Sequence, residues 1–63
     1  MGKTAEGLPV LRSIGQTAEH LGVSIKTVRR WVASGDLPSY RLGRSIRIAE
    51  PDLLNFIKLR RAT

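Results

Sequence analysis

The sequence contains no cysteine, so neither a disulfide framework nor a thiolate metal site can stabilise this 63-residue chain. No apolar run approaches the roughly 20 residues that a membrane-spanning helix needs. No charged segment leads into the apolar stretch of a secretory signal. We therefore expect a cytoplasmic protein that has no membrane partner and is held together by packing alone.

Acidic residues are scarce: five Asp and Glu stand against eleven Lys and Arg, which gives a formal net charge of +6 and a pI near 11.3. So basic a chain is suited to a polyanionic partner. The hydrophobic share of 41% and the charged share of 25% are typical of a folded domain and not of a disordered basic tail. A chain of this length has room for a single domain.

The residue types that carry catalysis or hold cofactors are also few. His20 is the only histidine, and the helical pattern around it places its side chain outwards, with no second ligand type nearby. A metal site and Ser-His-Asp chemistry both lack partners, and no glycine-rich phosphate loop is present. We predict that the protein is not an enzyme and that it uses no cofactor and no metal.

The sequence predicts two short helices joined by a tight turn. Ser13 and Gln16 have the spacing of a capping box, and Gly22 suits the left-handed conformation that ends a helix. Ser24 then has the position of a second N-cap. Two helices separated only by residues 22–24 predict a helix-turn-helix. The apolar stripe of the first helix comprises Ile14, Ala18 and Leu21.

The second predicted helix, residues 25–34, has a basic outward surface. At about 100° per residue, Lys26 and Arg30 lie opposite the apolar arc, Arg29 lies on its margin and Thr27 on its other flank. The alternative is an ordinary solvated helix face, but the preceding turn and the basic hairpin that follows favour nucleic-acid contact. Ser24 is first a structural cap and secondly a candidate phosphate contact. The arc itself comprises Ile25, Val28, Trp31 and Val32.

Residues 39–48 alternate with a period of two, which predicts a β-hairpin. If all four apolar residues share a face, Leu42 lies opposite Ile46 and Gly43-Arg44-Ser45 forms a three-residue tip. The sequence does not determine the turn type of this tip. Arg41 and Arg47 then share the outer face, where they protect the sheet edge, contact DNA or do both. The apolar face comprises Tyr40, Leu42, Ile46 and Ile48.

A last helix is predicted to begin at Glu50-Pro51-Asp52, where proline and acidic residues are favourable. Its core stripe comprises Leu53, Phe56 and Ile57, with Leu54 and Leu59 at the edges. Residues 1–9 lack periodicity and are interpreted as a flexible N-terminal arm ahead of a DNA-binding domain formed by residues 10–63. The sequence thus predicts a small α+β fold that is mostly α.

Three segments together resemble a known family: residues 23–32, Gly35-Asp36-Leu37-Pro38, and Arg41-Leu42-Gly43-Arg44. From Leu11 to Arg60 the chain resembles the excisionase branch of the MerR-like winged-helix family. The resemblance implies a winged helix-turn-helix with three helices and a two-stranded β-hairpin wing, whose second helix enters the major groove of DNA. The positions carried over are Lys26, Thr27 and Arg30 for the major groove, Arg29 for a phosphate, and Arg44 at the wing tip for the minor groove. Ser24, Arg41 and Arg47 are the further candidates for backbone contacts.

Excisionases of this family bind adjacent sites in several copies, bend DNA and change the direction of an integrase reaction. The resemblance therefore implies double-stranded DNA, neighbouring copies of the chain and a phage or plasmid integrase as partners. No long dimerising helix follows the last helix, so we expect no preformed coiled-coil dimer. The alternative is a small MerR-like transcription regulator. A protein-interaction module that uses the basic face, or an RNA binder, is less favoured, because the deep, narrow major groove of duplex RNA excludes a reading helix.

Overall fold

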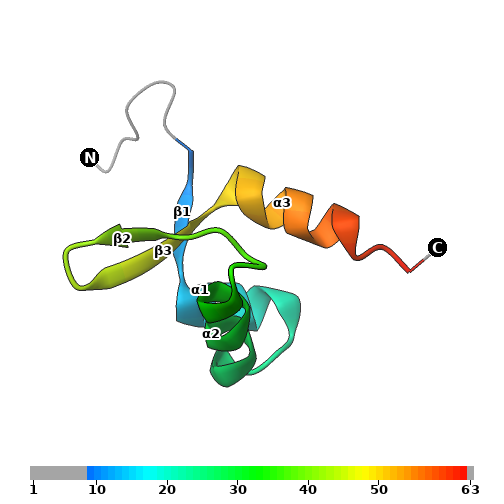
Figure 1. The fold of residues 1–63 in the computed structure, drawn as a ribbon, viewed down its shortest axis with the longest axis horizontal. Helices are drawn as coiled ribbons and strands as arrows, with labels where there is room; N and C mark the ends of the chain where they lie inside the picture. The colour runs from blue at the N-terminus through cyan, green and yellow to red at the C-terminus, as the bar shows by residue number, and fades with distance from the viewer. Residues whose placement is uncertain (1–8, 63) are drawn as a thin grey trace.

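Three short helices and three strands follow one another in the computed structural model, which describes residues 9–62 (Figure 1). Helices α1 and α2 lie on one side of the sheet, the β2–β3 hairpin projects away from them, and α3 leads to the C-terminus. The predicted α+β winged helix-turn-helix is confirmed. Of the predicted arm, residues 1–8 lie outside the described part of the chain. The elements are β1 (Leu11–Ser13), α1 (Ile14–Leu21), α2 (Ile25–Ser34), β2 (Tyr40–Leu42), β3 (Ser45–Ala49) and α3 (Glu50–Leu59).

The turn between α1 and α2 is fixed by local hydrogen bonds, as the sequence predicts. Both halves of the capping box form: the Gln16 amide donates to Ser13 Oγ at 3.0 Å, and the Ser13 amide donates to Gln16 Oε1 at 2.9 Å. Gly22 ends α1 in the left-handed conformation with φ of 70°, and the Val23 amide donates to the carbonyl of Ala18 at 3.0 Å. These hydrogen bonds define the conformation of the turn that joins the two helices.

The hairpin register differs from the predicted one. Leu42 pairs with Ser45 and Tyr40 pairs with Arg47, so the tip has two residues, Gly43 and Arg44, instead of three. Gly43 has a φ of 65° and Arg44 has no positive φ, which is the pattern of the II′ turn that two-residue hairpins favour. The prediction of a three-residue tip is therefore wrong. Because opposite residues share a face, Tyr40 and Leu42 lie on the other side of the sheet from Ile46 and Ile48.

The sheet also has a third strand that the sequence did not indicate. Strand β1 pairs antiparallel with β3, so the strand order is β1-β3-β2. Arg12 of β1 forms an ion pair with Glu50 at the start of α3, with 3.0 Å between Nη2 and Oε2. This strand therefore links the helix-turn-helix, the wing and α3.

The core lies between the three helices and the face of the sheet that carries Ile48. Trp31 packs against it, with its ring centroid 4.9 Å from that of Phe56, which confirms its predicted structural role. The prediction that Ile25 and Ile57 belong to the core is wrong. Ile25, at the first position of α2, is 49% exposed, and Ile57 is 41% exposed. The buried core residues are Ala18, Val28, Leu37, Ile48, Leu53 and Phe56.

Two buried residues, Leu37 and Thr17, were not predicted to belong to the core. Leu37 is 1% exposed, and its amide donates to the carbonyl of Trp31 at 3.1 Å, so the segment after α2 folds back under the helix. Thr17 is fully buried, and its hydroxyl donates to the carbonyl of Ser13 at 2.8 Å. A buried hydroxyl that is bonded in this way avoids the cost of an unpaired polar group.

Candidate nucleic-acid interface

Helix α2 presents its cationic side chains to solvent. Val28 is fully buried and fixes the rotation of the helix against the core, while Lys26, Arg29 and Arg30 are all exposed. No hydrogen bond or ion pair of the described residues occupies these three side chains. Ala33 is also exposed on this surface, three residues after Arg30 and four after Arg29. Sequence reasoning did not single out Ala33, although the helical spacing could have found it.

The N-terminus of α2 carries a pair of hydroxyl groups. Ser24 Oγ accepts the Thr27 amide at 3.1 Å and lies 2.9 Å from Thr27 Oγ1. One of the two hydroxyl groups donates in this contact, so the hydrogen of the other is left for a further acceptor. An anion next to this helix end is also favoured by the helix dipole. Ser24 is exposed and Thr27 half-buried, so an anion in solvent can reach the pair.

The wing separates Arg41 and Arg47, which the sequence had placed on one face. Arg41 lies opposite Ile46 and therefore shares the face that carries Ile48 and packs against the helices. Arg47 lies opposite Tyr40 on the other face. The prediction that Arg41 and Arg47 share an outer face is therefore wrong, because it depended on the three-residue tip. Arg44 is exposed at the tip, as expected.

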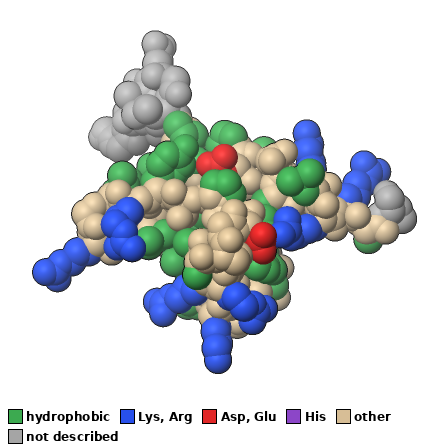
Figure 2. All heavy atoms as spheres, in the orientation of Figure 1, with side chains coloured by type: hydrophobic (Ala, Val, Ile, Leu, Met, Phe, Trp, Pro, Cys, Tyr) green, Lys and Arg blue, Asp and Glu red, His purple; other side chains and the backbone are tan. Residues whose placement is uncertain are grey.

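Basic side chains gather over the lower side of the molecule and along the projecting hairpin in Figure 2, where few acidic groups interrupt them. Between Ser24 and Ala49 the sequence has six Lys and Arg residues and a single acid, Asp36. Two other arginines have structural partners: Arg12 pairs with Glu50, and the guanidinium of Arg60 lies 3.8 Å from the centroid of the Phe56 ring. The candidate interface is formed by Lys26, Arg29 and Arg30 on α2, Arg41 on the helix-facing side of the wing and Arg44 at its tip.

Metal sites and membrane-spanning helices have no counterpart in the described residues. Residues 9–62 contain no group of three or more His, Cys, Asp or Glu side chains that could hold a metal ion. No helix in this part of the chain is long and apolar enough to cross a membrane.

Comparison with known proteins agrees with this geometry. The model of the helix-turn-helix domain family matches residues 13–61. An excisionase of Mycobacterium phage D29 is 57% identical over 42 residues, which cover 65% of this chain and 75% of that protein. This chain belongs to the excisionase-type helix-turn-helix family. No solved structure matches it.

A second relative of this excisionase-type domain is the transcriptional repressor DcmR of Methylorubrum extorquens. It is 42% identical over 55 residues, which cover 84% of this chain and 21% of the repressor. The chain thus spans about a fifth of that protein, so the likeness concerns one domain of a longer regulator.

Proposed function

We propose that this helix-turn-helix protein binds specific sites in double-stranded DNA and acts as an excisionase of a phage or another mobile element. The observation that carries the proposal is the exposed cationic surface of α2, which has no ion pair to another described residue and directly follows the tight turn of the helix-turn-helix motif. In this role the protein has no catalytic chemistry of its own. It positions and shapes DNA for an integrase.

Within this interface, α2 enters the major groove. Lys26, Thr27 and Arg30 contact base edges, since arginine and lysine donate well to guanine and a threonine hydroxyl can serve several bases. Arg29 and the Ser24 hydroxyl contact phosphates. The pairing of Thr27 Oγ1 with Ser24 Oγ at 2.9 Å also fixes the Thr27 side chain before DNA arrives.

The wing contributes two of its three arginines to the proposed interface. Arg44 reaches the minor groove from the tip, and Arg41 contacts the backbone from the helix-facing side of the sheet. Arg47 projects from the other side, so it is left out of the proposed DNA contacts. The revised set of backbone contacts is therefore Ser24, Arg29 and Arg41.

We further propose that several copies bind adjacent sites cooperatively and bend the DNA between them. A single module of this size buries only about 600–1,000 Å² on DNA, which limits its affinity. Neighbouring copies on tandem sites gain affinity through effective concentration even when their contact is weak. The resemblance to the excisionase family, of which the phage D29 protein is a named member, implies this arrangement of several copies on adjacent sites.

Footprinting on the attachment-site DNA of the source element, with and without its integrase, tests the excisionase role. We expect several adjacent protected sites inside a recombination arm, with enhanced cleavage where the DNA bends. We also expect the purified protein to increase excision relative to integration in a reaction with the integrase. Protection of a single site in a promoter, with no effect on recombination, would contradict this role.

The second candidate is a transcription regulator that blocks a promoter. The likeness to the repressor DcmR over 84% of this chain favours it, since the same kind of domain stands in a protein named as a repressor. A reporter fused to the nearest promoter distinguishes the two candidates: repression without any change in excision supports the regulator.

A further inference from the structure

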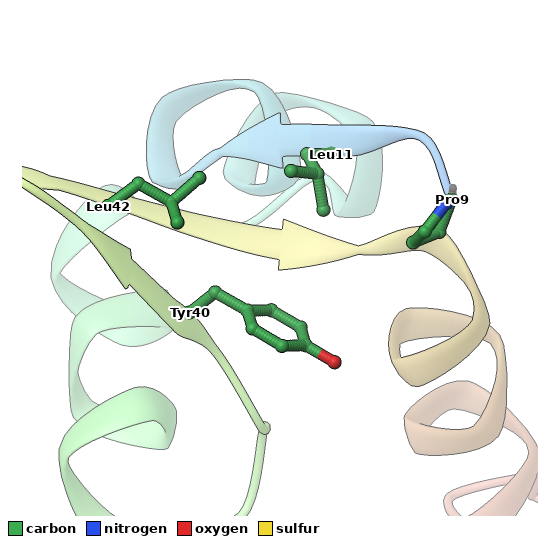
Figure 3. Close-up of a pocket in the computed structure, with 4 residues that line it drawn as sticks. All are labelled: Pro9, Leu11, Tyr40 and Leu42. Atoms are coloured by element: carbon green, nitrogen blue, oxygen red, sulfur yellow. The ribbon is translucent and has the colours of Figure 1, made fainter. Parts of the chain in front are cut away.

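The outer face of the sheet carries an apolar groove that the core does not use. It is lined by Pro9, Leu11, Tyr40 and Leu42, with a volume of about 300 Å³ (Figure 3). Leu11, Tyr40 and Leu42 are 40–51% exposed, although each is a large apolar residue. The two-residue hairpin tip creates this groove, because it turns Tyr40 and Leu42 away from the core and onto the side of Leu11. A contiguous exposed apolar surface of this kind often marks a binding site.

One cation lies on the same face of the sheet as these apolar side chains. In the register, Arg47 of β3 is flanked by Tyr40 on one strand and by Ser13 on the other, so it shares their face. Among residues 9–62, this guanidinium makes one hydrogen bond, from Nη1 to the carbonyl of its neighbour Ile46 at 3.1 Å. Its other N–H groups are available to a carboxylate, which arginine binds in a bidentate manner.

The charge of this face is complementary to an acidic partner. The residues that the register places on it, apart from Arg47, are uncharged: Leu11, Ser13, Tyr40, Leu42, Ser45 and Ala49. Glu50, which follows the end of β3, is paired with Arg12. A DNA backbone would place charge on this surface without using its apolar side chains, whereas a peptide with both apolar and acidic side chains uses both.

We propose that this groove binds a short peptide segment of a partner protein, which inserts apolar side chains between Leu11, Tyr40 and Leu42 and places a carboxylate on Arg47. The volume is at the lower end of the range for ligand pockets, so it accommodates a few side chains and not a bulky cofactor. The site lies on the side of the sheet away from α1 and α2, and it does not depend on the proposed DNA contacts.

Selection from a phage-displayed library of random peptides of about 12 residues, on the immobilised full chain, tests the proposal. We expect the enriched peptides to share at least two apolar residues and an Asp or Glu. Leu42→Asp should lower the affinity for a synthetic copy of the best peptide about tenfold or more, because it removes an apolar wall of the groove and repels the peptide's carboxylate. The matched control is Leu54→Asp on α3, which changes a leucine of similar exposure, 55% against 51%, and should leave binding unchanged.

Reversing the charge at position 47 distinguishes specific recognition of a carboxylate from nonspecific apolar adsorption. Selection on Arg47→Glu should enrich peptides with Lys or Arg in place of the acid, and Arg47→Gln should remove the charge preference if the reversal unfolds the chain. The proposal is overturned if no peptide is enriched over empty support, if Leu42→Asp and Leu54→Asp act alike, or if the charge preference ignores position 47. Concentration-dependent NMR shifts at Tyr40 and Leu42 without peptide would instead assign the groove to a second copy, which also overturns it.

Discussion

Replacing Arg41 and Arg47 separately by Gln measures which face of the wing meets DNA. The two changes remove the same charge from neighbouring strands and differ in the side of the sheet on which that charge lies. On duplex DNA, each phosphate contact contributes about 0.9 to the slope of log affinity against log salt. From about 50 to about 200 mM salt, one contact therefore corresponds to a change of about 3.5-fold in affinity.

We expect Arg41→Gln to lower the slope by about 0.9 and to weaken binding most at low salt. Arg47→Gln should change the slope by much less, because its side chain acts only through the overall charge. Fluorescence anisotropy with a labelled duplex over the salt range provides both slopes. Equal slopes for the two variants, or a larger effect for Arg47→Gln, would refute the assignment of the DNA-facing side. Circular dichroism must first show that both variants fold like the unmodified protein.

Three further predictions concern stability and assembly. Phe56→Ala should cost about 3–5 kcal/mol, because it leaves a cavity and removes the partner of both Trp31 and Arg60; urea unfolding measures this, and a loss below about 1 kcal/mol would contradict the packing. Gly22→Ala should destabilise by about 1–2 kcal/mol through its positive φ alone, since open space surrounds it, whereas Gly15→Ala in α1 should be neutral or stabilising; thermal melts compare them, and equal melting temperatures would exclude the strain. Gel shifts on a duplex with tandem sites should show cooperative complexes, and independent filling of the sites would contradict the assembly model.

The helices could be predicted from the sequence because their signals are local. Ser13 and Ser24 cap helices that begin one residue later, and Gly22 and Gly35 end them with positive φ values of 70° and 87°. Each of these contacts spans a few residues, so the sequence around it contains the whole cause. The basic face of α2 could be predicted for the same reason, since the period of a helix fixes which side chains lie opposite Val28.

The sheet could not be predicted in the same way. The predicted register placed all four apolar residues of the hairpin on one face. In the structure, Tyr40 and Leu42 lie on the other face from Ile46 and Ile48, so the alternation of residues along each strand did not determine the register. A glycine at the first tip position was the deciding signal, because it suits a two-residue II′ turn. Strand β1 has only three residues and pairs with β3 from far along the chain, where no local period reveals it. The side of the wing that carries each arginine therefore required the structure.

Binding of Lys26→Ala and Arg30→Ala to the preferred site and to random duplexes, at one salt concentration, measures whether α2 reads bases. The preferred site comes from selection on randomised duplexes. Each change should cost about 1–3 kcal/mol on the preferred site and much less on random DNA, because a base contact exists only on the correct sequence. Lys58→Ala, an exposed cation of α3, is the matched control and should affect both DNAs equally and slightly. Equal losses on both DNAs for Lys26→Ala and Arg30→Ala would show that α2 contacts only the backbone and would contradict the account.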